Sequence, residues 1–87
     1  MKGVMKMTAG FIKDQITVEI VEHLVTLSTK PNGWSKECNI VVWNHNEPKV
    51  VIREWSEDHK RMGKGVVLTE DEAVKLLNGL MNWKGVM

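Results

Sequence analysis

The first two thirds of the chain show the alternation of apolar and polar residues that is typical of β-strands. Residues 15–29 are rich in β-branched side chains and predict one long strand with a single buried face. On that buried face we expect Ile16, Val18, Ile20 and Leu24. The turn residues in KPNGW, at 30–34, end this strand and reverse the chain.

Three further strands are predicted after this turn, over residues 35–44, 49–55 and 63–69. Consecutive apolar residues at 40–42 interrupt the alternation of the first of these strands, so we expect a β-bulge there. Pro48 favours an extended residue before it and thereby marks the start of the next strand. Glycines on both sides of Lys64 mark the start of the last strand.

The end of the chain has the spacing of an amphipathic helix. Thr69, with Glu72 three residues later, forms a capping box that starts the helix, which runs to about residue 83 or 84. Its apolar stripe is wider than one face of a sheet can cover, so we expect a second copy of the chain to cover the rest. The predicted homodimer is held by residues 73–83, with Leu76, Leu77, Leu80 and Met81 at the interface. Four antiparallel strands followed by one C-terminal helix are an α+β arrangement.

Length and composition are those of one small globular domain. The chain has 87 residues, of which 43% are hydrophobic and 26% are charged. We expect a loose N-terminal extension over residues 1–14 and a folded domain over residues 15–84. The net charge of +1 does not by itself suggest a nucleic-acid-binding protein, so any basic surface must be local.

Several functional classes find no support in the sequence. Cys38 is the one cysteine, so no internal disulfide can form, and a reducing cytoplasm fits best. No apolar run is long enough to span a membrane, so we expect no membrane partner. The three histidines are scattered and lack metal-ligand spacing to Cys38, so we expect neither a metal site nor a cofactor. Because no nucleophile and base form a pair, we do not expect an enzyme.

Tryptophans and cations on the predicted strands are the most informative residues. Single-stranded nucleic acid is held by cations that follow its phosphates and by flat side chains on which its bases stack. Arg53 and Trp55 are two residues apart and share a strand face, about 6–7 Å from each other, and Lys49 has the same parity. The pattern alone leaves two interpretations open for Trp43 and Trp55, which are base stacking and a position in the core.

The stretch EPKVVIREWSEDHKRMGKGVVLTEDE, with GWSKECNIVVWN before it, resembles the transcriptional coactivator family called positive cofactor four, in its short bacterial branch. The matching features are the IREW strand, the acidic and then basic loop, the GKG strand entry and the capped terminal helix. The resemblance implies a curved sheet, a homodimer with its helices at the interface, and binding of single-stranded or melted DNA with little sequence preference. It also implies a role beside the transcription machinery, or in replication or repair.

Carried over by position, the resemblance also implies which residues bind DNA. Phosphates would be bound by Lys36, Lys49, Arg53 and Lys64 beside Gly65, with Lys60 and Arg61 in the loop as further candidates. Bases would stack on Trp43 and Trp55. Two alternatives stay open. One is an RNA-binding or RNA-chaperone module that uses the same side chains. The other is a protein-interaction module with its tryptophans in the core and its helix stripe docked on a different partner.

Overall fold

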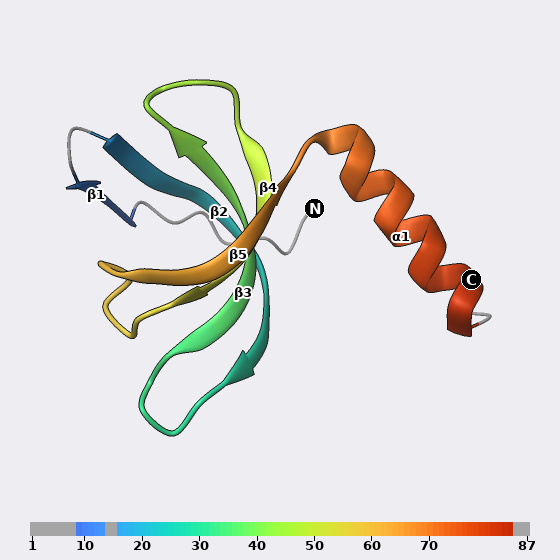
Figure 1. Cartoon of the computed structure of the whole chain (residues 1–87), viewed down its shortest axis with the longest axis horizontal. Coiled ribbons are helices and arrows are strands. Elements are labelled where there is room, and N and C mark those ends of the chain that lie inside the picture. Colours follow the sequence, from blue (N-terminus) through green and yellow to red (C-terminus); the bar gives the residue numbers. More distant parts are fainter. Residues whose placement is uncertain (1–8, 14–15, 85–87) are drawn as a thin grey trace.

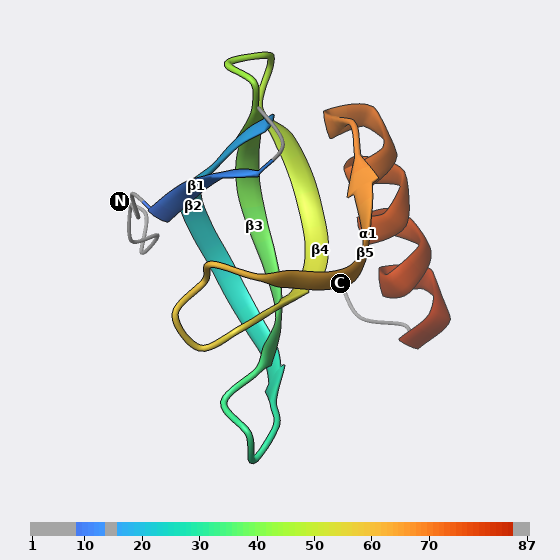
Figure 2. The same cartoon turned by 60° about the vertical axis from the view of Figure 1, so that its left-hand side comes forward.

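The computed structural model describes residues 9–13 and 16–84. Along the chain lie β1 (Ala9–Lys13), β2 (Ile16–Thr29), β3 (Ser35–Trp43), β4 (Lys49–Trp55), β5 (Met62–Leu68) and α1 (Glu70–Lys84). The strands form one antiparallel sheet in sequential order. The sheet is strongly twisted and curved, and α1 stands to one side of it (Figures 1 and 2). The predicted α+β order of four antiparallel strands and one C-terminal helix is therefore confirmed.

The strand β1 corrects the prediction for the N-terminal part. Residues 9–13, which we expected in a loose extension, pair with β2 from Ala9 opposite Ile20 to Lys13 opposite Ile16. A strand of five residues has little stability of its own, and the free edge of the much longer β2 provides its partner. The rest of the expected extension, residues 1–8 and 14, lies outside the described residues.

β2 departs from the simple alternation that its sequence predicts. It has three β-bulges against β3, which fall at Val21, Leu24 and Leu27. Each bulge adds one unpaired residue, so the side chains that follow it change faces. Leu24, which we expected to be buried, is 40% exposed. His23 instead pairs with the buried Asn39 and lies on the face that carries the core.

The bulge predicted at residues 40–42 does not lie in β3. This strand pairs with β4 without a register shift. The extra residue at this level of the sheet is Val21 in β2, which faces the step between Ile40 and Val41. The prediction was therefore wrong about the strand, because a bulge is a property of two paired strands and the pattern of one strand cannot assign it.

One face of the sheet, here called the inner face, carries the core. Its fully buried apolar side chains are Val18, Ile20, Val41, Val51 and Trp55, and Trp43 and Met62 pack against them. The opposite, outer face carries Lys36, Cys38 and Ile40 of β3, which pair with Glu54, Ile52 and Val50 of β4. The two faces alternate along β3 and β4 as the period of a strand requires.

The helix begins with the predicted capping box. Thr69 Oγ1 accepts a hydrogen bond from the backbone N–H of Glu72 at 3.1 Å, and the N–H of Thr69 donates to Glu72 Oε1 at 2.9 Å. Within the described residues, α1 contacts the sheet only at β4 and β5. Much of its apolar stripe is exposed, including Val74, Leu76, Leu77, Leu80 and Trp83. No helix in the described part of the chain is long and apolar enough to cross a membrane.

Candidate functional site

The predicted DNA-binding residues lie on both faces of the sheet. The strand register places Lys49 and Arg53 on the inner face, since they pair with the buried Val41 and Glu37. The same register places Lys36 on the outer face, opposite Glu54. The cations predicted as one set are therefore divided by the sheet.

A hollow of about 370 Å³ nevertheless joins four of the predicted residues. It is here called the basic hollow, and it is lined by Lys36, Arg53, Lys64 and Gly65 together with Glu54 and apolar side chains of β4 and β5. Glu54 is partly neutralised by Lys30, whose Nζ lies 3.4 Å from Glu54 Oε1. Lys36 of β3 and Lys64 of β5 therefore leave the basic hollow with a net positive charge.

Arg53 is held in place by contacts within the protein. Its Nη1 donates to the carbonyl oxygen of Gly63 at 2.9 Å, and its guanidinium carbon lies 5.6 Å from the centroid of the Trp43 ring. Burial lowers the pKa of Arg53. At Gly65, which pairs with Arg53, an added Cβ would lie 2.6 Å from both Arg53 Cβ and the carbonyl oxygen of Ile52. Glycine is thus required at position 65 because the Arg53 side chain passes over it.

Trp55 belongs to the core, which corrects the expectation that it stacks bases. Its side chain shares a face with Arg53, as predicted, but it is only 1% exposed. The loop between β4 and β5, residues 56–61, lies next to it, and the rings of Trp55 and His59 are 5.8 Å apart. A ring that is buried offers no face to a base. The core interpretation that the pattern left open is therefore the right one for Trp55.

Trp43 and Lys49 lie outside the lining of the basic hollow, and their surroundings are less suited to binding DNA. Trp43 is partly buried, packs against the core and has Arg53 over its ring. Lys49 lines a separate hollow of about 490 Å³ between the β3–β4 turn and the start of α1. The acidic Glu47 and Glu70 line that hollow too, and Glu47 Oε1 lies 3.9 Å from Lys49 Nζ. The prediction that Trp43 stacks a base stays a prediction.

Trp34 is a second aromatic candidate, which the pattern of the sequence did not indicate. The ring is partly exposed at the end of the β2–β3 turn, and the Arg61 guanidinium carbon lies 5.7 Å from its centroid. An added Cβ at Gly63 would lie 3.6 Å from the Trp34 ring and 3.4 Å from Glu54, so Trp34 lies near Glu54, which lines the basic hollow. No spacing rule connects positions 34 and 61, because the loop 56–61 brings them together.

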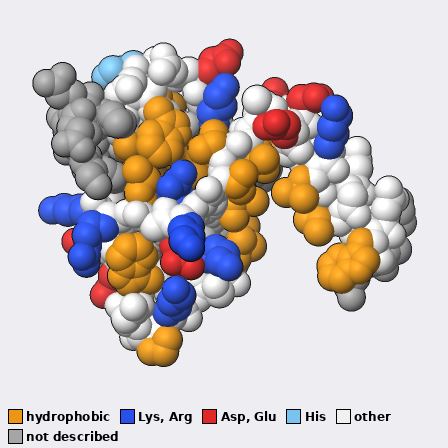
Figure 3. Space-filling model, in the orientation of Figure 1, with side chains coloured by type: hydrophobic (Ala, Val, Ile, Leu, Met, Phe, Trp, Pro, Cys, Tyr) orange, Lys and Arg blue, Asp and Glu red, His pale blue; other side chains and the backbone are white. Residues whose placement is uncertain are grey.

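The surface view agrees with this arrangement. Lys and Arg side chains gather around hydrophobic ones over the sheet, whereas hydrophobic side chains lie along the helix (Figure 3). Lys60 and Arg61 are both exposed in the loop, as expected for residues that contact a ligand. The sheet therefore presents cations with an aromatic side chain among them, which is the chemistry that single-stranded nucleic acid requires.

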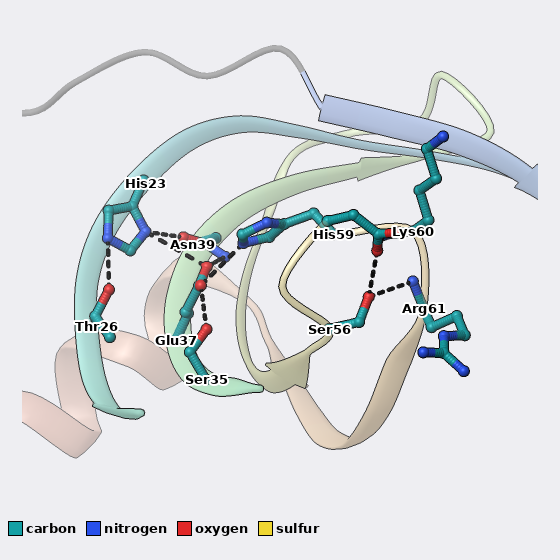
Figure 4. Close-up of polar contacts among 10 residues, drawn as sticks. His23, Thr26, Ser35, Glu37, Asn39, Ser56, His59, Lys60 and Arg61 are labelled. Atoms are coloured by element: carbon teal, nitrogen blue, oxygen red, sulfur yellow. Dashed lines mark hydrogen bonds and ion pairs between the residues drawn. The ribbon is translucent and has the colours of Figure 1, made fainter. Parts of the chain in front are cut away.

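Below this surface lies a polar network around one buried carboxylate (Figure 4). Glu37 of β3 is 4% exposed and accepts hydrogen bonds from Ser35, from Asn39 Nδ2 at 3.0 Å and from His59 Nε2 at 2.9 Å. His23 Nδ1 lies 2.6 Å from Asn39 Oδ1 and 3.6 Å from Glu37 Oε1. The two histidines, which looked unrelated in the sequence, thus approach the same carboxylate from β2 and from the β4–β5 loop.

The network keeps Glu37 ionised. Burial alone would raise the pKa of Glu37, but hydrogen bonds from Asn39, Ser35 and His59 outweigh it, with help from the charge of His59. The net effect lowers the pKa below its ordinary value of 4.5. A carboxylate only accepts hydrogen bonds, so His59 Nε2 carries the proton in this contact.

A lowered pKa makes Glu37 a source of stability that depends on pH. The contribution is fully present above the ordinary carboxyl pKa and is lost as the pH falls through the lower folded-state pKa. We expect the parent to be more stable than Glu37→Gln at pH 7, and the difference to shrink as the pH falls below the ordinary carboxyl pKa of 4.5. Urea unfolding of both proteins over this range measures the difference. A constant difference at all pH values would contradict the role assigned to Glu37.

Comparisons with known proteins place the chain in a family. Residues 30–79 match the model of the family described as Transcriptional Coactivator p15 (PC4). An uncharacterized protein of Treponema pallidum (strain Nichols) is 45% identical over 67 residues, which cover 77% of this chain and 79% of that protein. Among the described residues, no group of three His, Cys, Asp or Glu side chains could hold a metal ion. The family match covers β3, β4, β5 and most of α1, and the chain belongs to the transcriptional coactivator p15 (PC4) family.

Proposed function

We propose that the protein binds single-stranded DNA, largely without sequence preference, as a homodimer that acts in transcription, replication or repair. The observation that carries the proposal is the position of Trp34 and Arg61 beside the basic hollow. Membership of a family known for binding single-stranded DNA and for transcription coactivation supports it.

The geometry divides the work of binding between two kinds of side chain. Lys36 and Lys64 of the basic hollow, with Lys60 and Arg61 of the loop, attract the phosphates. The Trp34 ring is partly exposed and offers a flat surface that accepts any base. Arg61 can leave the ring and contact a phosphate when a base stacks there, since an arginine over an aromatic ring is bound by only about 0.5–1 kcal/mol at an exposed site.

The dimer is supported by the helix. Leu77 is 55% exposed and Leu80 is 49% exposed, and α1 contacts its own sheet only at β4 and β5 among the described residues. A chain of this length buries a small core, so covering this stripe with the same stripe of a second copy would stabilise both copies. The interface we propose contains Leu76, Leu77, Leu80 and Met81 of each copy.

Trp34 provides the variant that tests the binding surface. Trp34→Ala should weaken binding of a single-stranded oligonucleotide by about 1–3 kcal/mol, the usual loss for one stacked base. Trp34→Phe should keep most of the affinity, because phenylalanine still offers a flat ring. Fluorescence anisotropy titrations of the parent and both variants make the comparison, with thermal melting to show that each variant is folded.

Two outcomes would count against this surface. If Trp34→Ala binds as tightly as the parent, Trp34 does not stack a base. RNA offers the same phosphates and stackable bases as DNA, so it could occupy the same surface. If RNA of matched sequence competes better than DNA for the parent protein, the function is RNA binding instead.

A further inference from the structure

The loop between β4 and β5 is attached to the sheet by a contact that the proposed binding surface does not use. The loop, residues 56–61, leaves β4 and bends back so that His59 reaches Glu37 on β3 (Figure 4). His59 has a positive φ of 60°, a conformation that non-glycine residues seldom adopt. The imidazole therefore reaches the carboxylate at the cost of an unfavourable backbone conformation.

The interior of the loop is itself hydrogen-bonded. The side chain of Ser56 donates to Asp58 Oδ1 at 2.7 Å and accepts from the N–H of Arg61 at 3.0 Å. The N–H of Lys60 donates to Asp58 Oδ1 at 3.0 Å, and the N–H of His59 donates to the Ser56 carbonyl at 2.9 Å. These bonds join His59 to Lys60 and Arg61, so a contact that fixes His59 also fixes its neighbours, and without that contact the bonds of so short a loop open more often.

Glu37, the partner of His59 in this contact, is also held by hydrogen bonds. Ser35 and Asn39 both donate to the Glu37 carboxylate, and His23 and Thr26 extend the chain of hydrogen bonds into β2. Arg53 pairs with Glu37 across β3 and β4 and lies on the same face. Glu37 is therefore a buried, negatively charged anchor whose neighbours on β2 and β3 hold it in place.

We propose that the Glu37–His59 contact is a latch that positions the loop 56–61 so that Lys60 and Arg61 can contact the DNA phosphates. The inference rests on the proposed function, and it assigns His59 and Glu37 as positioning residues that do not touch the DNA. With the latch closed, Arg61 lies over Trp34 beside the basic hollow. With the latch open, both cations are displaced from that place although the sheet stays folded.

His59→Asn is the test variant, because asparagine tolerates a positive φ but is too short to reach Glu37. His45→Asn is the matched control. It replaces a histidine that also has a positive φ, 61°, and that lies in the β3–β4 turn at the other end of β3. Amide hydrogen exchange reports whether the loop is released, and the salt dependence of binding to single-stranded oligo(dT) counts the phosphate contacts.

In His59→Asn we expect faster exchange at the loop amides of residues 59–61 and unchanged exchange in β3 and β4. The log–log salt slope should become shallower by about 1.4, which corresponds to two lost phosphate contacts on a single strand. Replacing Lys60 and Arg61 with alanine should make the parent's slope shallower by the same amount, but should change nothing further in His59→Asn. His45→Asn should match the parent in both measurements.

Three results would overturn the latch. The first is that the loop amides of His59→Asn keep their protection from exchange. The second is that the loop is released but the salt slope is unchanged. The third is that replacing Lys60 and Arg61 adds its full effect to that of His59→Asn. If the parent protein binds no oligo(dT), the proposed function is overturned instead. The titration of the parent shows this before any variant is compared.

Discussion

Replacing Trp55 with alanine is expected to lower the free energy of unfolding by about 3–5 kcal/mol. Trp55 is 1% exposed and lies in one cluster with Val18, Ile20, Val41 and Val51. Its removal leaves a large cavity at the end of β4 and takes away the ring beside His59. Small domains have only about 5–15 kcal/mol of stability in total, so the variant loses much of what it has.

Urea unfolding and thermal melting measure this loss. Trp34→Ala is the natural comparison, because Trp34 is partly exposed and outside the core cluster, and it should melt close to the parent. The opposite pattern, in which Trp55→Ala melts normally and binds single-stranded DNA poorly, would return Trp55 to the binding surface. It would also mean that the loop 56–61 does not cover its ring.

The helix gives the second large effect. Leu77→Glu should convert the proposed dimer to monomer, because each copy would lose a leucine that the interface buries, worth about 1.5–3 kcal/mol, and the two copies lose it together. The dimer should therefore dissociate about 10²–10⁴ times more readily, even before the cost of burying the two charges is added. Analytical ultracentrifugation over a range of concentrations measures the change.

Asn78→Glu is the control for this substitution, since it adds the same charge beside the apolar stripe rather than within it. It should leave the dimer intact. A parent protein that sediments as a monomer at micromolar concentration would remove the basis for a dimer through α1, whatever the variants do.

Local features of the structure followed from the sequence. The capping box at Thr69 and Glu72 needs only four consecutive residues, so its pattern predicted the start of α1 correctly. The pleat of a strand is equally local, and it placed Arg53 and Trp55 on one face as found. The wide stripe of α1 is likewise visible both in the sequence and as exposed leucines in the structure.

Features that depend on contacts between distant segments could not be predicted from the sequence. The alternation of residues along a strand shows which side chains share a face, but not whether that face is core or surface. Trp55 is buried on the core face, where the loop 56–61 lies next to it. His23 and His59 meet at Glu37 only because the bulge at Val21 turns His23 inward and the loop bends back over the sheet. Trp34 meets Arg61 for the same reason, so no spacing along the chain could have identified that pair.

The most direct test of DNA binding is a titration of the unaltered protein with a single-stranded oligonucleotide and with the duplex of the same sequence, at several salt concentrations. The geometry predicts tighter binding to the single strand, because the Trp34 ring can stack only on an unpaired base. With about three or four phosphates neutralised per strand, the log–log salt slope should be roughly −2 to −3. Equal affinity for the duplex, or binding that does not change with salt, would contradict single-stranded DNA binding by this sheet.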